Sequence, residues 1–250
     1  MKKSLSSLVL AGALLVGAVA PVTASAATTS STGKTTTSVE FTKPTAPVTP
    51  VDPDNPSTPV KTDPGKTDHG GATDPSKAGD LAFLYVSKGI NFGTHQSVTT
   101  KTEAAAQSFT AESVDSQDFG TGTPNANLVT EVSDARGTNA GWEVSVTASD
   151  LTGDNGSSIT GASLQLNGAA TDAKNKVMNS ADDTIASNSK TLTTGGSAEM
   201  LYSAAVGHGA GTTAMQIAPD NISLSNLPVN VKAGTYTGTL NWTLGDTPES

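Results

Sequence analysis

The sequence has no cysteine, few aromatic residues and few basic residues. Without cysteine the chain forms no disulfide, performs no thiol chemistry and holds no cysteine-ligated zinc. Its 14 Lys and Arg against 23 Asp and Glu give a net charge of −9, so it lacks the basic surface that nucleic-acid binding requires. The 4% aromatic content, in a chain rich in Thr, Ser, Ala and Gly, favours sheets and turns over long helices. A chain of 250 residues suits one β domain with a tail.

Residues 1–26 have the three parts of an export signal. Lys2 and Lys3 form the basic part, residues 8–20 are apolar, and residues 24–26 read Ala-Ser-Ala, a small-x-small cleavage site. The apolar part is short for a bilayer span. We therefore predict a secreted protein with no membrane insertion in its mature form.

Residues 27–78 are rich in Pro, Asp and Thr and poor in large apolar side chains. Six prolines follow one another at three-residue intervals: Pro44, Pro47, Pro50, Pro53, Pro56 and Pro59. Three residues per turn is the period of a polyproline II helix. The segment is predicted to be a disordered, extended spacer. The alternative is a docking ligand for a proline-reading domain.

From residue 79 to 250 the sequence predicts one all-β, sandwich-like domain. Short apolar or alternating segments recur about every ten residues, which is typical of a sandwich or barrel. Strands are expected within 81–86, 90–93, 128–133, 141–148, 158–166, 200–206, 213–217, 221–227 and 234–244. Residues 97–110 are expected to form no more than a turn, and residues 171–186 to be irregular.

The two tryptophans of the chain lie in two of these strands. Trp142 and Val144 share one face of the segment 141–148, and Trp242 and Leu244 share one face of 234–244. Strict alternation of this kind indicates one buried and one wet face. Both segments read Trp, any residue, then Val or Leu.

Several ordered pieces of the chain resemble the WxL-domain cell-surface proteins of Gram-positive bacteria. They are Ile-Asn-Phe-Gly at 90–93, Val-Ser-Asp-Ala-Arg-Gly at 132–137, Gly-Trp-Glu-Val at 141–144, Ser-Ile-Thr-Gly-Ala at 158–162, and Tyr-Thr-Gly-Thr-Leu-Asn-Trp-Thr-Leu at 236–244. The resemblance covers residues 79–248 and makes this part a C-terminal WxL domain. It implies non-covalent attachment to the cell wall, with peptidoglycan as receptor, and association with other surface proteins.

Four motif residues and one charged pair are the candidate wall-binding positions. For Trp142, Val144, Trp242 and Leu244, alternation favours a place in the core, and direct contact of the indole rings with wall sugars is the alternative. Arg136, the only arginine, lies near Asp134 in the turn before the first motif. The pair is expected to fix that turn through an ion pair or bonds to carbonyls. The alternative is a fork for a carboxylate of the wall peptide.

Catalysis and cofactors have little support in the sequence. It contains no nucleophile elbow, phosphate loop or His-Glu-x-x-His motif. The paired carboxylates at 182–183, 150 with 154, and 115 with 118 leave a glycosidase as a weak alternative, and the loop 150–156 leaves a loose Ca²⁺ site. We predict no enzyme, no metal and no cofactor.

The residues after Leu244 include no apolar tail and no Leu-Pro-x-Thr-Gly signal. We therefore expect a secreted protein held at the cell wall by non-covalent binding. The alternative function is a structural or adhesive component of a multiprotein surface complex that binds partner proteins or host matrix through a free sheet edge.

Overall fold

The computed structural model describes residues 31–60, 67–167, 176–181, 183–246 and 248. The chain divides into two units, residues 1–40 and 41–250. In the first unit, residues 31–40 are exposed and form no helix or strand. The predicted signal peptide at 1–26 lies outside the described residues and stays a prediction. No helix of the described part is long and apolar enough to cross a membrane.

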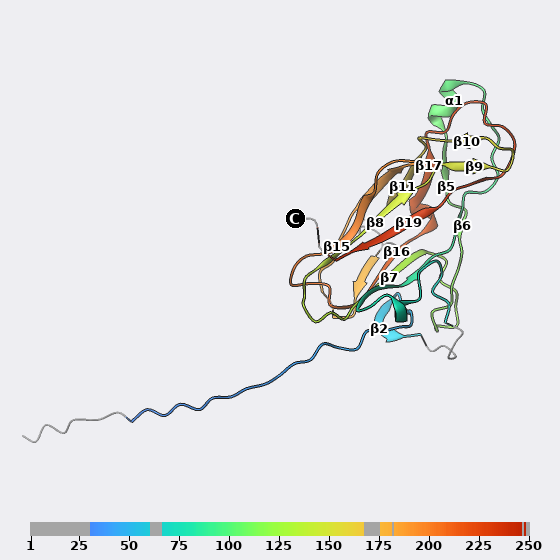
Figure 1. The fold of residues 1–250 in the computed structure, drawn as a ribbon. Helices are drawn as coiled ribbons and strands as arrows, with labels where there is room; N and C mark the ends of the chain where they lie inside the picture. The colour runs from blue at the N-terminus through green and yellow to red at the C-terminus, as the bar shows by residue number, and fades with distance from the viewer. Residues whose placement is uncertain (1–30, 61–66, 168–175, 182, 247, 249–250) are drawn as a thin grey trace, which may run out of the picture. The chain divides into compact units, whose positions relative to one another are not determined.

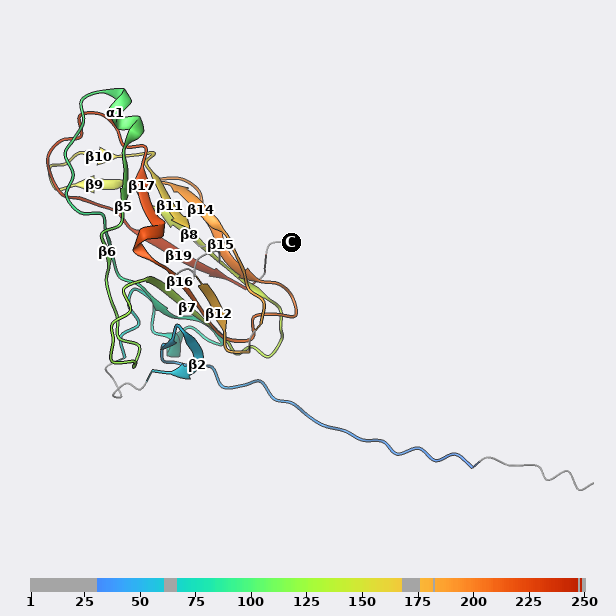
Figure 2. The ribbon, with the colours of Figure 1, turned by 180° about the vertical axis from the view of Figure 1, so that it is seen from behind.

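The second unit is built from antiparallel strands, which confirms the predicted all-β, sandwich-like class (Figures 1 and 2). Its three largest sheets have four strands each. The first contains, in spatial order, β12 (Lys176–Asn179), β16 (Gly211–Ile217), β7 (Leu128–Asp134) and β3 (Leu81–Val86). The second contains β13 (Ala186–Ser187), β15 (Glu199–Ala204), β8 (Trp142–Ala148) and β19 (Leu240–Gly245). The third contains β14 (Ser189–Thr193), β11 (Ser163–Asn167), β17 (Ile222–Ser225) and β5 (Ser108–Thr110).

The remaining sheets of this unit are smaller. One contains β10 (Ser158–Ile159), β9 (Leu151–Gly153) and β18 (Tyr236–Thr237), and another pairs β4 (Ile90–Asn91) with β6 (Ser113–Val114). The hairpin of β1 (Val51–Asp52) and β2 (Asn55–Pro59) lies at the end away from α1 (Lys101–Ala106) and the β9–β10 strands (Figure 1). Two short 3-10 helices, η1 (Pro75–Lys77) and η2 (Pro219–Asn221), complete the described elements.

One large hydrophobic core joins the three four-stranded sheets. It includes the fully buried Trp142, Tyr202, Leu166 and Met215. Strand β8 alternates buried and half-buried residues along its whole length, as the pattern of its sequence predicts. A second, smaller cluster of Tyr85, Phe119 and Val129 covers the other face of the β7–β3 pair. Every residue of β7 is therefore buried.

The predicted spacer folds in part onto the domain. The β1–β2 hairpin packs on β7 and β16: the Val51 amide donates to Glu131 Oε2 at 2.9 Å, and the Thr212 hydroxyl donates to the Pro56 carbonyl. Pro53 and Pro56 are buried. Asp52 and Pro53 open a tight turn in which Asp52 Oδ1 accepts the Asp54 amide at 2.9 Å. The proline spacing therefore does not produce a continuous extended helix here, because turn residues at 52–55 fold the chain back.

Other local predictions also need correction. Residues 101–106 form a helix because Thr100 and Glu103 make a reciprocal capping box, with Glu103 N–Thr100 Oγ1 at 3.2 Å and Thr100 N–Glu103 Oε2 at 3.3 Å. Within the region expected to be irregular, residues 176–179 form β12.

The last predicted strand is split in two. The first part, β18, pairs with β9, and the second part, β19, pairs with β8. Gly238 and Thr239 lie between the two strands. A Cβ at Gly238 would lie 2.8 Å from Leu151 Cδ2, and the Thr239 amide donates to the Ser149 hydroxyl at 2.9 Å. A larger residue at this position would require the Leu151 side chain to move, because the chain passes close to β9.

Candidate functional site

The two tryptophan motifs lie side by side on neighbouring strands. In the antiparallel pair of β8 and β19, Leu244 is opposite Val144 and Trp242 is opposite Val146. Residues directly opposite one another project to the same face of a sheet. The motif side chains from both strands therefore share the face that is turned to the core.

Trp142 is completely buried. Its ring packs edge-on against Tyr202 with centroids 5.7 Å apart, and its indole Nε1–H donates to the Gly209 carbonyl at 2.9 Å. A Cβ at Gly209 would lie 2.5 Å from that nitrogen, so only glycine fits beneath the indole. The predicted core position is thus confirmed for Trp142, and this ring has no surface with which to stack on a sugar.

Trp242 has a different environment. It lies on β19, which is the last strand of its sheet among the described residues, and its side chain is half-buried against the core together with Leu240 and Leu244. The spacing of the second motif matches the first, yet only one side of its strand is paired. Trp242 therefore remains partly exposed.

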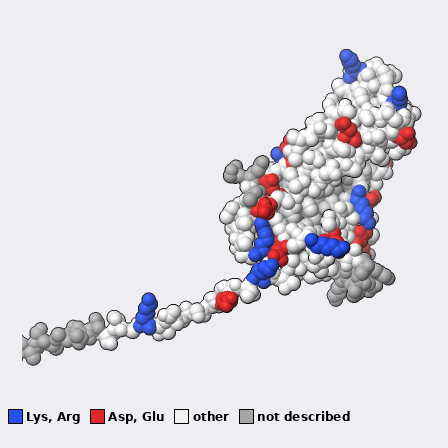
Figure 3. Space-filling model, in the orientation of Figure 1, with Lys and Arg blue, Asp and Glu red and all other residues white. Residues whose placement is uncertain are grey.

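The outward face of this strand pair is polar and almost uncharged. Asn241 and Thr243 are exposed on β19, opposite the half-buried Thr147 and Ser145 of β8, and Glu143 ends the row opposite Gly245. Figure 3 shows that the part of the surface over β8, β19 and β16 has few charged side chains. This face offers hydroxyl and amide groups in a regular array.

Arg136 fastens the ends of the strands that bear the motifs. Its Nε and Nη2 form two bonds with the carboxylate of Asp134, at 2.9 and 2.8 Å. Nη2 also donates to the Gly141 carbonyl just before Trp142, at 2.6 Å, and Nη1 to the Asp246 carbonyl just after β19, at 3.2 Å. The bond with Asp134 raises the pKa of Arg136. The guanidinium fork is occupied inside the protein, which matches the predicted role in fixing the turn.

In the first candidate pair of catalytic carboxylates, Asp183 makes structural contacts. Asp182 lies outside the described residues. The Asp183 carboxylate accepts hydrogen bonds from His208 Nδ1 and from the Gly209 backbone N–H, both at 2.6 Å. The bond with His208 lowers the pKa of Asp183. Since the Gly209 carbonyl receives the Trp142 indole, Asp183 holds the loop beneath the core tryptophan.

Asp118 and Asp150, from the other two candidate pairs, lie outside helices and strands. Asp118 Oδ1 accepts three amides of its own loop, from residues 120–122. Asp150 has one buried carboxylate oxygen, Oδ1, without a hydrogen-bond partner in the described part of the chain. No group of three His, Asp or Glu that could hold a metal occurs among the described residues.

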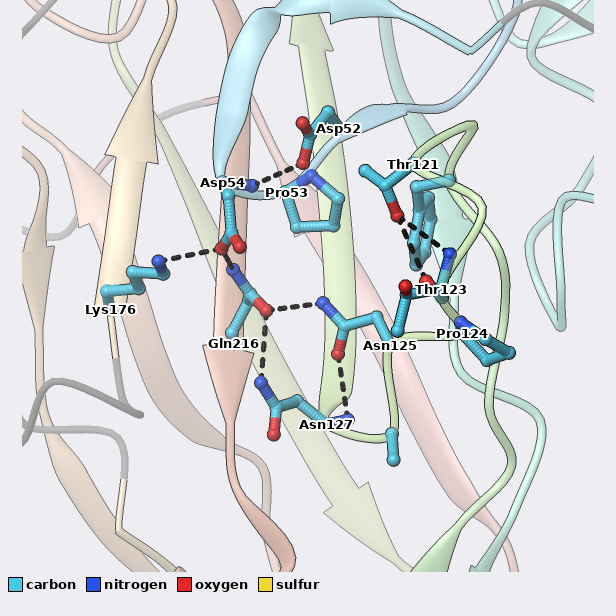
Figure 4. Close-up of a pocket in the computed structure, with 12 residues that line it drawn as sticks. Asp52, Pro53, Asp54, Thr121, Thr123, Pro124, Asn125, Asn127, Lys176 and Gln216 are labelled. Carbon is cyan, nitrogen blue, oxygen red and sulfur yellow. Dashed lines mark hydrogen bonds and ion pairs between the residues drawn. The ribbon is translucent and has the colours of Figure 1, made fainter.

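A cavity of about 400 Å³ lies between the β1–β2 turn, the segment 119–127 and the strands β12 and β16 (Figure 4). Its centre is Gln216, which is almost fully buried and bonds to Asp54, Asn125 and Asn127. The sequence alone could not identify this pocket, because its walls come from four distant segments.

Comparison with known proteins agrees with the motif geometry. The chain matches the model of a family described as "WxL domain surface cell wall-binding" over residues 28–248. The match begins far before residue 79, so the family domain is not confined to the C-terminal part that the sequence analysis assigned to it. No curated protein and no solved structure matches significantly. Since the model covers most of the sequence, the chain belongs to the WxL family of surface cell wall-binding domains.

Proposed function

We propose that the chain is a secreted protein that attaches non-covalently to wall peptidoglycan through the outward face of β8 and β19. The observation that supports this surface is the row of uncharged polar side chains on the two motif strands, Ser145, Thr147, Asn241 and Thr243. The tryptophans and the Arg136–Asp134 pair hold these strands in place from behind.

The chemistry of this face fits the charge of the protein. With a net charge of −9, the chain is repelled by anionic wall polymers. Binding therefore relies on hydrogen bonds and apolar contacts with neutral groups, which hydroxyl and amide side chains provide. No step of this proposal requires catalysis or a bound metal.

Co-sedimentation with purified sacculi tests the proposal. The protein is expected to sediment with sacculi stripped of teichoic acid, in the presence of chelator, and moderate salt should leave binding unchanged or strengthen it by screening repulsion. Asn241→Asp, which adds a charge at nearly constant shape, should weaken sedimentation about tenfold. The control is Gln165→Glu, at an exposed position of β11. Binding that falls steeply with salt, or equally in both variants, would contradict the proposal.

A second candidate function is assembly with other surface proteins. Strand β19 has a neighbour on one side only within the described residues, and Leu240, Trp242 and Leu244 are half-exposed along it. A partner strand could pair with this edge. Capture of one defined surface protein by a chain that ignores bare sacculi would favour this function over wall attachment.

A further inference from the structure

We propose that the cavity around Gln216 binds a neutral acetamido sugar residue of a glycan chain. This site is distinct from the outward face of β8 and β19. It rests on the proposed wall attachment only for the choice of a glycan as ligand. Its volume of about 400 Å³ lies in the usual range of small-molecule sites, about 300–1,000 Å³.

The amide groups of the pocket are fixed before any ligand arrives. Gln216 is 1% exposed, and its Oε1 accepts Asn125 Nδ2 at 2.6 Å and Asn127 Nδ2 at 3.1 Å. Its Nε2 donates to Asp54 Oδ1 at 2.6 Å, and the backbone N–H of Asn127 donates to Asn125 Oδ1 at 2.9 Å. Figure 4 shows these side chains converging on the glutamine from two segments, the β1–β2 turn and residues 119–127. Such a network lowers the entropy cost of ordering side chains on binding.

The network leaves hydrogen-bonding groups for a ligand. A primary amide has two N–H donors and one acceptor oxygen. Asn125 and Asn127 each use one N–H on Gln216, and the Asn127 side-chain carbonyl has no bond within the described residues. Together these groups offer donors and an acceptor, which is the set that an acetamide and its neighbouring hydroxyls need.

Part of the remaining wall is apolar, beside charged and hydroxyl side chains. Phe119, the first residue of the segment 119–127, is buried and packs edge-on against Tyr85 with ring centroids 4.9 Å apart. Pro53 and Pro124 contribute their rings from the hairpin turn and from that segment (Figure 4). Of these three rings Pro124 is exposed, and it suits the C–H face of a sugar ring or the methyl group of an acetamide.

The charges of the pocket select against anions. Lys176 Nζ is 2.7 Å from Asp54 Oδ1, so its charge is neutralised by that carboxylate, and the contact lowers the pKa of Asp54. Asp52 adds a second carboxylate to the lining. The excess of negative charge disfavours phosphate and carboxylate ligands. The pocket therefore favours the neutral acetamido sugar over an anionic wall polymer.

Titration of the purified protein with the β-1,4-linked trimer of N-acetylglucosamine tests the proposal by NMR. We expect shifts of the Asn125 and Asn127 side-chain amides. Cellotriose, which has the same linkage but hydroxyls in place of acetamides, should bind at least about tenfold more weakly, as should glycerol phosphate. Asn127→Ala should weaken trimer binding about tenfold, since it removes two hydrogen-bonding groups. The matched control, Gln96→Ala at an exposed amide elsewhere, should not change it.

The unmodified protein gives the decisive result, so the test does not depend on the folding of a variant. Absence of shifts in the pocket at millimolar trimer, equal binding of cellotriose, or preference for glycerol phosphate would overturn the proposal. Co-sedimentation separates this outcome from failure of the proposed function. If the protein sediments with sacculi but ignores the trimer, only the pocket is wrong; if it binds the trimer but not sacculi, only wall attachment is wrong.

Discussion

The two tryptophan motifs have the same form but occupy different environments. Trp142 lies in a strand with neighbours on both sides and is completely buried, whereas Trp242 lies on an edge strand and is half-buried. The alternation of each motif determines which face its tryptophan shares with its neighbours. The position of the strand in the sheet determines how deeply that face is covered. We therefore expect the first motif to govern stability and the second to lie closer to the binding surface.

Replacement of Trp142 should have the largest effect. Trp142→Ala removes the ring that packs on Tyr202 and leaves the Gly209 carbonyl without its donor. We expect a loss of about 3–5 kcal/mol in the free energy of unfolding, measured by urea denaturation. Wall binding should disappear only where the variant has unfolded. A native-like variant that no longer sediments with sacculi would show that Trp142 acts in binding.

A change of pH should alter the free energy of unfolding through Glu131, which lies under the β1–β2 hairpin and outside the two motifs. Burial raises the pKa of Glu131 from 4.5 to about 8, with Asp52 adding to the shift. The folded state therefore retains a proton that the unfolded state loses above about pH 4.5. The contribution of Glu131 to stability should be fully present below that pH and fall by about 2–4 kcal/mol as the pH rises to 8.

Urea denaturation across this range, with Glu131→Gln for comparison, measures the effect. The glutamine variant should lose most of the pH dependence. If wild type and variant show the same pH profile, the carboxyl group is not the cause.

Loss of Arg136 should disturb both motif strands together. Arg136→Ala leaves Asp134, whose side chain is 2% exposed, as a buried charge without its ion-pair partner. We expect a loss of about 2–3 kcal/mol, because the arginine itself is partly exposed. Hydrogen exchange should accelerate near residues 141 and 246 alike. Arg136→Lys keeps the charge but loses the fork, and should recover only part of the stability.

Replacement of Trp242 should have the smallest effect on stability. Because the ring is half-buried, Trp242→Ala should cost about 1–2 kcal/mol and leave a cooperative transition. Comparison with Trp142→Ala under the same conditions measures the difference between the two motifs directly. Equal losses would contradict the assignment of β19 as a lightly covered edge strand.

The sequence identifies much of the domain because alternation is a local signal. The strands at 81–86 and 142–148 agree with the prediction, and the predicted strand within 158–166 is divided into β10 and β11. The pairing of Arg136 with Asp134 could also be predicted, because the two residues are only two positions apart in a turn. These features depend on neighbours in the chain.

Features that depend on contacts between distant segments could not be predicted from the sequence. The β1–β2 hairpin has few apolar side chains of its own, and its position follows from the need to cover the second face of β7 near Glu131 and Val129. The pocket unites Asp54, Asn127 and Gln216, which are distant in the sequence. Two local features were also missed. The prolines around residues 52–55 suggested an extended spacer, and the Thr and Ser residues around 101–106 argued against the helix that the capping box at Thr100 begins.

Cysteine protection on the wall tests the central claim most directly, because the natural chain has no cysteine to interfere. Single variants Asn241→Cys, Thr243→Cys and Gln165→Cys place one thiol at an exposed position on β19 or on β11. The measurement is the rate of maleimide labelling, free and bound to sacculi. We predict that bound sacculi slow labelling at 241 and 243 at least about tenfold and leave 165 unchanged. Equal labelling of all three thiols in the bound state would contradict attachment through the outward face of the motif strands.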